Sequence, residues 1–443
     1  MRAAEGRAIA LGMTAESLMA RAGEAVAEQV RRLAAGAEVL VMCGPGNNGG
    51  DGYVVADTLR RAGHPVRVAA LSSPTAASAA AAQARWAGPI ESLADVAPAP
   101  VMVDALFGIG MNRPLSSEAA EWLGGAIRAA HLSVAVDVPS GVSTDDGATL
   151  GAVLPLNLTL AIGAVKPAHV LQPSAALCGE VRLIDIGLDA ESNVRVAEVP
   201  RLSAPPTGAH KYSRGLVVVI AGRMPGAAAL AACAAGHGGA GYVRLLGSST
   251  DRLPHAIVRK PFTDEALADT RIGAMVVGPG LGRDEKAKER LAAALQSGRP
   301  LVIDGDALHL LGDEQARVPT VLTPHAGEFS SLFGDLAGSK IDRAQQAARR
   351  SNAVVVFKGA DTVIASPDGR AVVHSTGPSW LATAGTGDVL AGIIGAQLAG
   401  GADAFTAATN GVWLHAESAR LSGAAFIADD LVAHLPAAFG ACL

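Results

Sequence analysis

Cysteine is scarce in this sequence, which holds only four in 443 residues: Cys43, Cys178, Cys233 and Cys442. Their spacing matches no metal-ligand motif, and they are too few for a dense disulfide framework. We expect them to be small buried side chains in a reducing compartment, and therefore expect a cytoplasmic protein.

Aromatic residues, long apolar runs and excess positive charge are also lacking. Only 3% of the residues are aromatic, although 50% are hydrophobic and 52 are glycine. The apolar stretches are short and rich in Ala and Gly, which predicts no membrane span, and the start of the chain lacks the apolar core of a signal peptide. A net charge of -5 argues against nucleic acid as a partner. The composition that remains is typical of layered α/β folds with many tight turns.

The length predicts two or three domains. Two series of strands and helices lie on either side of Glu198–Gly208, a segment with three prolines, which is the best linker candidate. We therefore expect α/β domains at 1–200 and 205–443, and we expect a homo-oligomer.

Apolar runs indicate the strands of both domains. Those expected in the first domain are Val39–Cys43, Pro65–Leu71, Val101–Asp104, Ser133–Asp137 and Leu158–Ile162, with helices over Thr14–Leu33, Asp51–Ala62 and Ser117–Ala130. Those expected in the second are Leu216–Ala221, Tyr242–Leu246, Ala274–Val277, Leu301–Asp304, Thr320–Leu322 and Val354–Phe357, followed by a hairpin over Asp361–His374.

A glycine-rich loop, Gly44–Gly52, follows the first expected strand and matches G-x-G-x-x-G. A dinucleotide-binding turn of that kind also needs an acidic residue about twenty residues further on to hold the ribose. No Asp or Glu lies between Asp57 and Glu91, so a conventional dehydrogenase is disfavoured. Asn47, Asn48 and Asp51 add polar groups that a bare turn does not require.

Two further carboxylates, Asp104 and Asp137, end expected strands. Ligands of open parallel sheets bind at the carboxyl ends of the strands, so Asp51, Asp104 and Asp137 could share one crevice. The alternative is that such aspartates only cap the loops that follow them. Three of them beside glycine-rich loops favour a functional site.

Gly44–Gly52, Asp104–Gly110 and Ala135–Val142 together resemble the epimerase domain of NAD(P)H-hydrate repair enzymes, over about residues 1–200. The resemblance implies a Rossmann-like parallel sheet, a potassium ion held by Asn48, Asp104 and Ser140, and Asp137 as the acid/base; an all-oxygen set suits a hard cation. It implies that substrate contacts Asn47, Asn48, Gly49, Gly50, Asp51, Gly108, Ile109, Gly110, Met111, Asn112, Arg113, Pro114 and Asp137. Lys166 is a further candidate, equally consistent with a solvated surface lysine.

A second glycine-rich loop, Ala384–Asp388, opens an expected helix that runs to about Leu398. Free N–H groups at Gly385–Gly387 suit a transferring phosphoryl group, and the Asp388 carboxylate is placed to accept a proton from an attacking hydroxyl. The alternative, an Asp388 that caps the helix, explains the aspartate but not the Gly-Thr-Gly before it.

Four other segments of the second half suit a nucleotide site: Gly278–Gly282, Asp304–Asp306, Thr323–Glu328 and Lys358–Thr362. His325 and Glu328 could reach a ring or a ribose, although a single histidine is often a satisfied loop residue. Lys358 could hold phosphates, although lysine and glycine together also fit a plain turn.

In this order the segments resemble the ribokinase-like dehydratase domain of the same repair enzymes, over about 205–443. The resemblance implies ADP as co-substrate with Mg²⁺ and the hydrated dinucleotides NADHX and NADPHX as substrates. Implied substrate contacts are Ala227, Gly282, His325 and the catalytic Asp388; implied nucleotide contacts are Lys358, Gly359, Ala360, Asp361, Thr362 and Gly387. Ala221–Ala227 and Pro378–Leu381 depart from the family pattern.

The implied function is repair of NADH or NADPH that has added water at C6. The second domain would phosphorylate the hydroxyl with ADP and eliminate phosphate, leaving AMP, and the first would interconvert the R and S epimers. Two alternatives remain open. One is a ribokinase-type kinase of a vitamin precursor with a regulatory N-terminal domain, which leaves Gly44–Gly52 unexplained. The other makes the N-terminal half a nucleotide sensor or scaffold.

Overall fold

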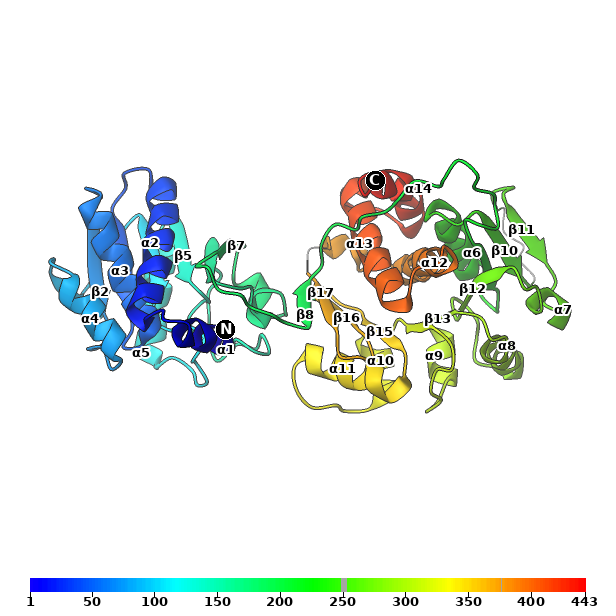
Figure 1. The fold of residues 1–443 in the computed structure, drawn as a ribbon, viewed down its shortest axis with the longest axis horizontal. Coiled ribbons are helices and arrows are strands. Elements are labelled where there is room, and N and C mark those ends of the chain that lie inside the picture. The colour runs from blue at the N-terminus through cyan, green and yellow to red at the C-terminus, as the bar shows by residue number, and fades with distance from the viewer. Residues whose placement is uncertain (248–252, 376) are drawn as a thin grey trace. The chain divides into compact units, whose positions relative to one another are not determined.

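The computed structural model describes residues 1–247, 253–375 and 377–443. Its residue contacts group the chain into two compact units, Met1–Ser192 and Asn193–Leu443. In Figure 1 the first unit is coloured from blue to cyan and the second from green to red. Both units are α/β, as the sequence predicted. Within the described residues, no helix combines the length and the apolar character needed to cross a membrane.

The first unit is built on a seven-stranded sheet in the order β3-β2-β1-β4-β5-β6-β7, and all its strand pairs are parallel. Its strands are β1 (Val39–Cys43), β2 (Val66–Ala70), β3 (Ile90–Ser92), β4 (Val101–Ala105), β5 (Leu132–Val136), β6 (Leu158–Ile162) and β7 (Glu180–Ile184). The order reverses between β1 and β4, and such a switch point is where open α/β sheets bind ligands.

Helices cover both faces of this sheet: α1 (Arg2–Ala10), α2 (Ala15–Ala34), α3 (Asn47–Arg61), α4 (Ala77–Arg85) and α5 (Ser117–Ala129). Successive side chains of β1 point to opposite faces. Val41 packs in the core that α2 and α3 share, whereas Met42 packs with Leu123 of α5. Helix α3 begins four residues before the expected Asp51, so Asn47–Asp51 is the first helical turn and not an extended loop.

The second unit contains a ten-stranded sheet in the order β11-β10-β9-β12-β13-β14-β15-β16-β17-β8. Its strands are β8 (Val194–Val196), β9 (Leu216–Ile220), β10 (Tyr242–Leu246), β11 (Ile257–Lys260), β12 (Ile272–Val277), β13 (Leu301–Ile303), β14 (Thr320–Leu322), β15 (Val354–Phe357), β16 (Thr362–Ala365) and β17 (Ala371–His374). Strands β16 and β17 pair antiparallel, which confirms the predicted hairpin.

Helices flank this sheet as well (Figure 1): α6 (Pro225–His237), α7 (Asp264–Leu267), α8 (Glu285–Gln296), α9 (Asp306–Leu310), α10 (Ala326–Phe333), α11 (Lys340–Ser351), α12 (Thr386–Ala399), α13 (Ala404–Ser422) and α14 (Ala428–Gly440). Leu390 and Ile394 of α12 pack in the main core with Val217, Val276 and Ala231. A Cβ on Gly387 would lie 3.9 Å from Asp304 Oδ2, so the first turn of α12 lies at the carboxyl end of β13.

The division between the units lies nearer the N-terminus than the expected ranges 1–200 and 205–443. Strand β8 pairs in parallel with β17, so it belongs to the second sheet. Glu198–Gly208 contains no helix or strand, as expected, but it follows β8. Because Leu202 N donates to Cys442 O at 2.9 Å, part of this segment lies on the second unit and does not simply bridge the two.

Candidate active sites

A cavity of about 440 Å³ opens at the switch point of the first sheet. Predicted residues that line it are Asn47, Asn48, Asp51, Gly108, Ile109, Gly110, Met111 and Asp137. Asn112, Arg113 and Pro114 line an adjoining cavity of about 600 Å³, which shares Phe107, Gly110 and Met111 with the first. Met1 and Glu5 of the N-terminal segment also line the first cavity, which the sequence did not indicate.

The buried glycines of Gly44–Gly52 serve close packing. A Cβ on Gly44 would lie 1.7 Å from Leu106 O, and one on Gly49 would lie 1.9 Å from Gly44 O. A Cβ on Gly50 would lie 2.6 Å from Met19 Cε. Gly49 and Gly50 therefore let α3 approach its neighbours, and neither lines the cavity beside Asn48.

Asp104 and Ser140 are buried and do not line the cavity, but Asp104 joins two loops next to it. Its carboxylate accepts hydrogen bonds from Ser140 N at 2.8 Å, Ser140 Oγ at 2.7 Å and Leu106 N at 3.1 Å. Burial raises the pKa of the Asp104 carboxyl, and the bonds from Ser140 and Leu106 oppose that rise. The simple alternative of a loop-fixing aspartate thus describes part of what Asp104 does.

Asn48 lies beside the same loops, since a Cβ on Gly108 would be 3.0 Å from Asn48 Oδ1. Its side-chain Nδ2 is buried, with no hydrogen-bond partner in the described part of the chain. An amide free to turn its oxygen, a buried carboxylate and the Ser140 hydroxyl form an oxygen donor set that fits a hard monovalent cation. Among the described residues no group of three or more His, Cys, Asp or Glu could hold a metal ion.

Asp137 is held from behind by Lys166 and His169. Its φ is +70°, a conformation unusual for a residue with a side chain. Lys166 forms an ion pair with its carboxylate, and His169 Nε2 lies 2.7 Å from its backbone oxygen. Lys166 is only 6% exposed, which excludes the solvated surface lysine.

Asp51 faces this group from α3. Burial, and then the charges of Asp137 and Glu5, raise the pKa of Asp51 well above its usual range, while the charge of Lys166 opposes the rise. The raised pKa favours the protonated form of Asp51, which would give the cavity a proton donor across from the Asp137–Lys166 ion pair.

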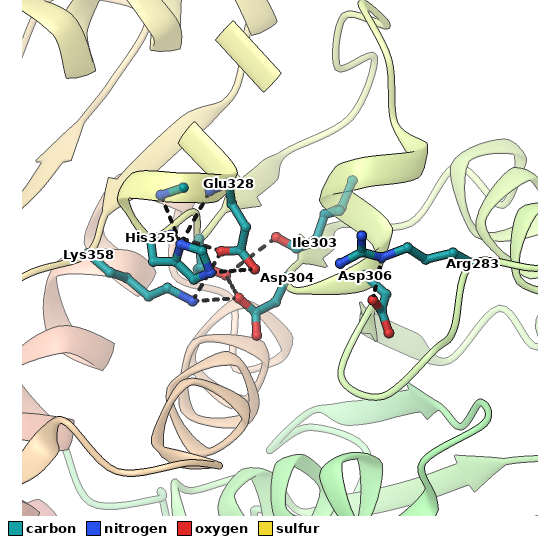
Figure 2. A network of polar contacts seen from close by, with 9 residues as sticks. Arg283, Ile303, Asp304, Asp306, His325, Glu328 and Lys358 are labelled. Carbon is teal, nitrogen blue, oxygen red and sulfur yellow. Dashed lines mark hydrogen bonds and ion pairs between the residues drawn. The ribbon is translucent and has the colours of Figure 1, made fainter. Parts of the chain in front are cut away.

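In the second unit, Asp304 and Lys358 form the centre of a buried polar network (Figure 2). Lys358 Nζ donates to Asp304 Oδ1 at 2.9 Å, and Thr323 Oγ1 donates to the same oxygen at 2.6 Å. Glu328 Oε2 lies 3.9 Å from Lys358 Nζ. Burial lowers the pKa of Lys358, but Asp304, Glu328 and Asp388 together raise it above its ordinary value.

The loop before α12 brings Asp388 to this network. Gly385, with φ +90°, is the N-cap of α12, and the helix has no side-chain cap. Asp388 is therefore in the first turn and does not cap the helix, which excludes the capping alternative. Burial and then the charge of Asp304 raise the pKa of Asp388 to about 7, against the opposing charge of Lys358. A Cβ on Gly387 would lie 3.3 Å from Lys358 Nζ, so the lysine borders the backbone of this loop.

His325 and Glu328 have a structural role at the start of α10. His325 Nδ1 accepts from Gly327 N and Glu328 N at 3.0 and 3.2 Å, and Glu328 Oε2 accepts from His325 N at 2.9 Å. The His325 side chain is 60% exposed. The histidine is thus a satisfied cap whose outer edge stays open to a ligand.

Asp306 fixes the loop that carries Gly282. Its carboxylate accepts from Gly282 N at 3.0 Å and from Arg283 Nε at 2.8 Å, as Figure 2 shows for Arg283. Ala227 lies near this loop, since a Cβ on Gly280 would be 3.0 Å from its Cβ.

Lys358–Thr362 is the turn between β15 and β16. Gly359 and Ala360 are exposed, whereas Asp361 is buried. Asp361 Oδ1 accepts from Lys340 Nζ at 2.5 Å, a second lysine that the sequence did not indicate. A larger cavity of about 650 Å³ lies elsewhere in this unit, between α8, α9 and strands β13 and β14, and no predicted site residue lines it.

Comparison with known proteins finds a matching family model for each half of the chain. Residues 217–436 match the family model described as NAD(P)H-hydrate dehydratase, and residues 15–168 match the one described as YjeF-related protein N-terminus. An ADP/ATP-dependent NAD(P)H-hydrate dehydratase of Bacillus subtilis, co-crystallised with ATP/Mg²⁺, is 29% identical, with a TM-score of 0.50, and covers 55% of this chain and 95% of its own. A ribokinase-like superfamily protein of Enterococcus faecalis, 23% identical with a TM-score of 0.51 over 57% of this chain and 98% of its own, shares the fold.

Full-length relatives cover both units. A bifunctional NAD(P)H-hydrate repair enzyme of Mycobacterium tuberculosis is 38% identical over 90% of this chain and 88% of its own length. The enzyme of the same name from Escherichia coli is 34% identical over 94% of this chain and 87% of its own. The chain belongs to the family of bifunctional NAD(P)H-hydrate repair enzymes.

Proposed function

We propose that this chain repairs NADHX and NADPHX, the hydrated forms of NADH and NADPH, in two reactions. The first unit interconverts the R and S epimers at C6, and the second unit uses ADP to dehydrate the S epimer, releasing NAD(P)H, AMP and phosphate. The observation that carries the proposal is that a chain related over its length to bifunctional repair enzymes has a polar site at the carboxyl edge of each sheet.

In the second unit, Asp388 is the base that takes the proton of the C6 hydroxyl as this oxygen attacks the terminal phosphate of ADP. A carboxyl whose pKa is about 7 exchanges its proton readily near neutral pH. The N–H groups of Gly385–Gly387 and the ammonium of Lys358 stabilise the phosphoryl group in transfer. Phosphate then leaves, because it is a far better leaving group than hydroxide, and the ring double bond returns.

Mg²⁺ and the nucleotide belong to the same site. A relative was crystallised with ATP/Mg²⁺. Among the described residues, no group of three or more His, Cys, Asp or Glu could hold a metal ion. Both observations fit a Mg²⁺ ion that is held mainly by the nucleotide phosphates, with one or two carboxylates from Asp304 and Asp388. When bound, the metal neutralises phosphate charge. Lys358, Gly359, Ala360, Asp361, Thr362 and Gly387 are the proposed nucleotide contacts; Ala227, Gly282, His325 and Asp388 are the proposed dinucleotide contacts.

In the first unit, C6 carries its hydroxyl next to the ring nitrogen, whose lone pair assists departure of the oxygen. Asp51, whose raised pKa favours the protonated form, gives a proton to the departing hydroxyl, and the carbon becomes planar. Asp137 then removes a proton from the water that adds to the other face, which restores the hydrate as its epimer. Asn48, Asp104 and Ser140 would hold a potassium ion, which supplies fixed positive charge beside the substrate.

A mixture of both epimers tests the two reactions together, with ADP present and formation of NADH as the signal. A vitamin-precursor kinase would leave both epimers unchanged, and a sensor domain would leave the R epimer unchanged. The proposal also includes a cytoplasmic location and a homo-oligomer; four free cysteines fit a reducing compartment.

A further inference from the structure

The backbone of Asp137 is held in a conformation that L residues rarely adopt. Its φ of +70° lies in the left-handed region, which is unfavourable for a residue other than glycine and persists where the surrounding structure enforces it. The strain lies at a residue that lines the epimerase cavity, so its cause bears on how that site works.

His169, at the end of the short 3₁₀ helix Pro167–His169, fixes the Asp137 backbone. Its Nδ1 accepts a hydrogen bond from Lys166 N at 2.9 Å, so the ring proton is on Nε2, and Nε2 donates to Asp137 O at 2.7 Å. Burial lowers the pKa of His169 to about 4, which keeps the ring neutral and this tautomer in place. Asp137 N donates to Leu160 O at 2.9 Å, so both backbone groups of Asp137 are engaged.

Lys166 fixes the Asp137 side chain. Its Nζ contacts Asp137 Oδ1 and donates to Ile162 O at 2.6 Å, and the same Oδ1 accepts from Ile162 N at 3.0 Å. No hydrogen bond in the described residues engages Asp137 Oδ2. One carboxylate oxygen is therefore anchored in the protein, and the other is left to the cavity.

We propose that Lys166 and His169 are positioning residues of the epimerase site, which together hold Asp137 so that its Oδ2 faces the substrate. Lys166 does not line the cavity, so it acts through Asp137. The inference deepens the proposed function and rests on it. It assigns the segment Lys166–His169, which contacts Asp137 but does not line the cavity, to the support of the catalytic site of the first unit.

The full-length chain offers a test with its own internal control. Lys166→Met keeps most of the length of the unbranched side chain and removes the ammonium. His169→Leu removes both hydrogen bonds, whereas His169→Gln retains a donor and an acceptor. We expect kcat for epimerisation to fall by roughly 10²-fold in Lys166→Met and His169→Leu, with KM for the R epimer within about threefold of the parent because the cavity lining is unchanged. His169→Gln should recover part of the loss.

Two controls separate positioning from folding. Dehydration of pure S epimer by the second unit should be unchanged in every variant. Thr159→Val removes a buried hydrogen bond of 2.7 Å to Cys178 O in the same unit, away from the cavity, and should leave epimerisation close to the parent rate. If Lys166→Met no longer binds the R epimer, the comparison of His169→Gln with His169→Leu decides.

The inference is overturned if Lys166→Met binds the R epimer and retains the parent kcat, if the losses in the His169 variants appear in KM alone, or if His169→Gln is no better than His169→Leu. A parent chain that fails to epimerise would instead remove the proposed function, so the two failures are distinguishable.

Discussion

Lys358 Nζ lies 2.9 Å from Asp304 Oδ1, and a Cβ on Gly387 would come within 3.3 Å of the same nitrogen. The pair thus joins the carboxyl ends of β13 and β15, next to the loop that opens α12. Asp304 and Lys358 shift the pKa of Asp388 in opposite directions. The ion pair therefore sets the charge next to the proposed base as well as next to the phosphoryl group.

Dehydration should depend on the ionisation of Asp388. Because Asp388 acts as a base and its pKa is raised to about 7, kcat should rise with pH and level off above about pH 7. Asp388→Asn should lose roughly 10²–10⁴-fold in kcat while it still binds nucleotide and epimerises. Steady-state rates measured across pH test this rise, the acidic limb of the kcat profile. A kcat of the parent that does not change with pH would contradict it.

Asp304→Asn should move that limb to lower pH. The negative charge of Asp304 is the largest electrostatic cause that raises the pKa of Asp388, after burial, and Asp306 contributes less. Asp306→Asn is the matched control and should shift the limb by a smaller amount in the same direction. The dependence of kcat on pH, measured side by side for the two variants and the parent, shows which variant shifts the rise in kcat further. A shift of this rise to higher pH in Asp304→Asn would refute the argument.

Asp388 should also make stability depend on pH. Its folded pKa is raised from 3.8 to about 7, so between these values the folded state binds more protons than the unfolded state, and stability falls as pH rises. The Asp388→Asn variant does not lose stability in this way, because its amide does not ionise. The melting temperature of the variant relative to the parent should therefore increase from about pH 4 to about pH 7 and then stay constant. A constant difference throughout would show that Asp388 ionises normally.

The potassium assignment predicts a specific ion dependence. Asn48→Ala removes one proposed oxygen donor and should raise the K⁺ concentration needed for half-maximal epimerisation by roughly 10–100-fold. Ser133→Ala is the control, because Ser133 is a buried polar residue of the same unit that is not a proposed ligand. Epimerisation rates over a K⁺ titration provide the measurement, and identical curves for Asn48→Ala and the parent would remove the metal site.

Strand β8 predicts where the chain can be divided. A fragment 193–443 keeps the pairing of β8 with β17, whereas a fragment 205–443 exposes β17 as an edge strand. Both should dehydrate S epimer, but 205–443 should melt at a lower temperature and aggregate more readily. Equal melting temperatures would show that β8 adds nothing to the second unit.

Continuous apolar runs gave the central strands correctly, because buried parallel strands have few polar positions. Val39–Cys43 and Thr320–Leu322 have the predicted bounds. Strand β7 was not predicted, since Glu180, Arg182 and Leu183 give no alternation that marks a buried face and only Ile184 of the strand is buried. The start of α3 was also missed, because Asn and Gly are poor helix formers and only the packing of Gly44, Gly49 and Gly50 explains a helix there.

Candidate site residues could be predicted where they lie within one sequence motif. They could not be predicted where the fold brings together two residues that are far apart in sequence. Asp51, Asp104, Asp137 and Asp388 were all identified at the ends of strands or in glycine-rich loops. Lys166 could not be separated from a surface lysine, because its partner Asp137 is 29 positions away in sequence.

The measurement that tests the two-reaction account most directly is NADH formation from a known mixture of R and S hydrates, with saturating ADP, Mg²⁺ and K⁺. The account predicts that the parent restores NADH from both epimers. Asp137→Asn should stop at the share that was S and then proceed only at the uncatalysed rate of epimerisation, and Asp388→Asn should restore almost none. A parent that leaves the R epimer untouched, or an Asp388→Asn variant within about tenfold of the parent, would contradict it.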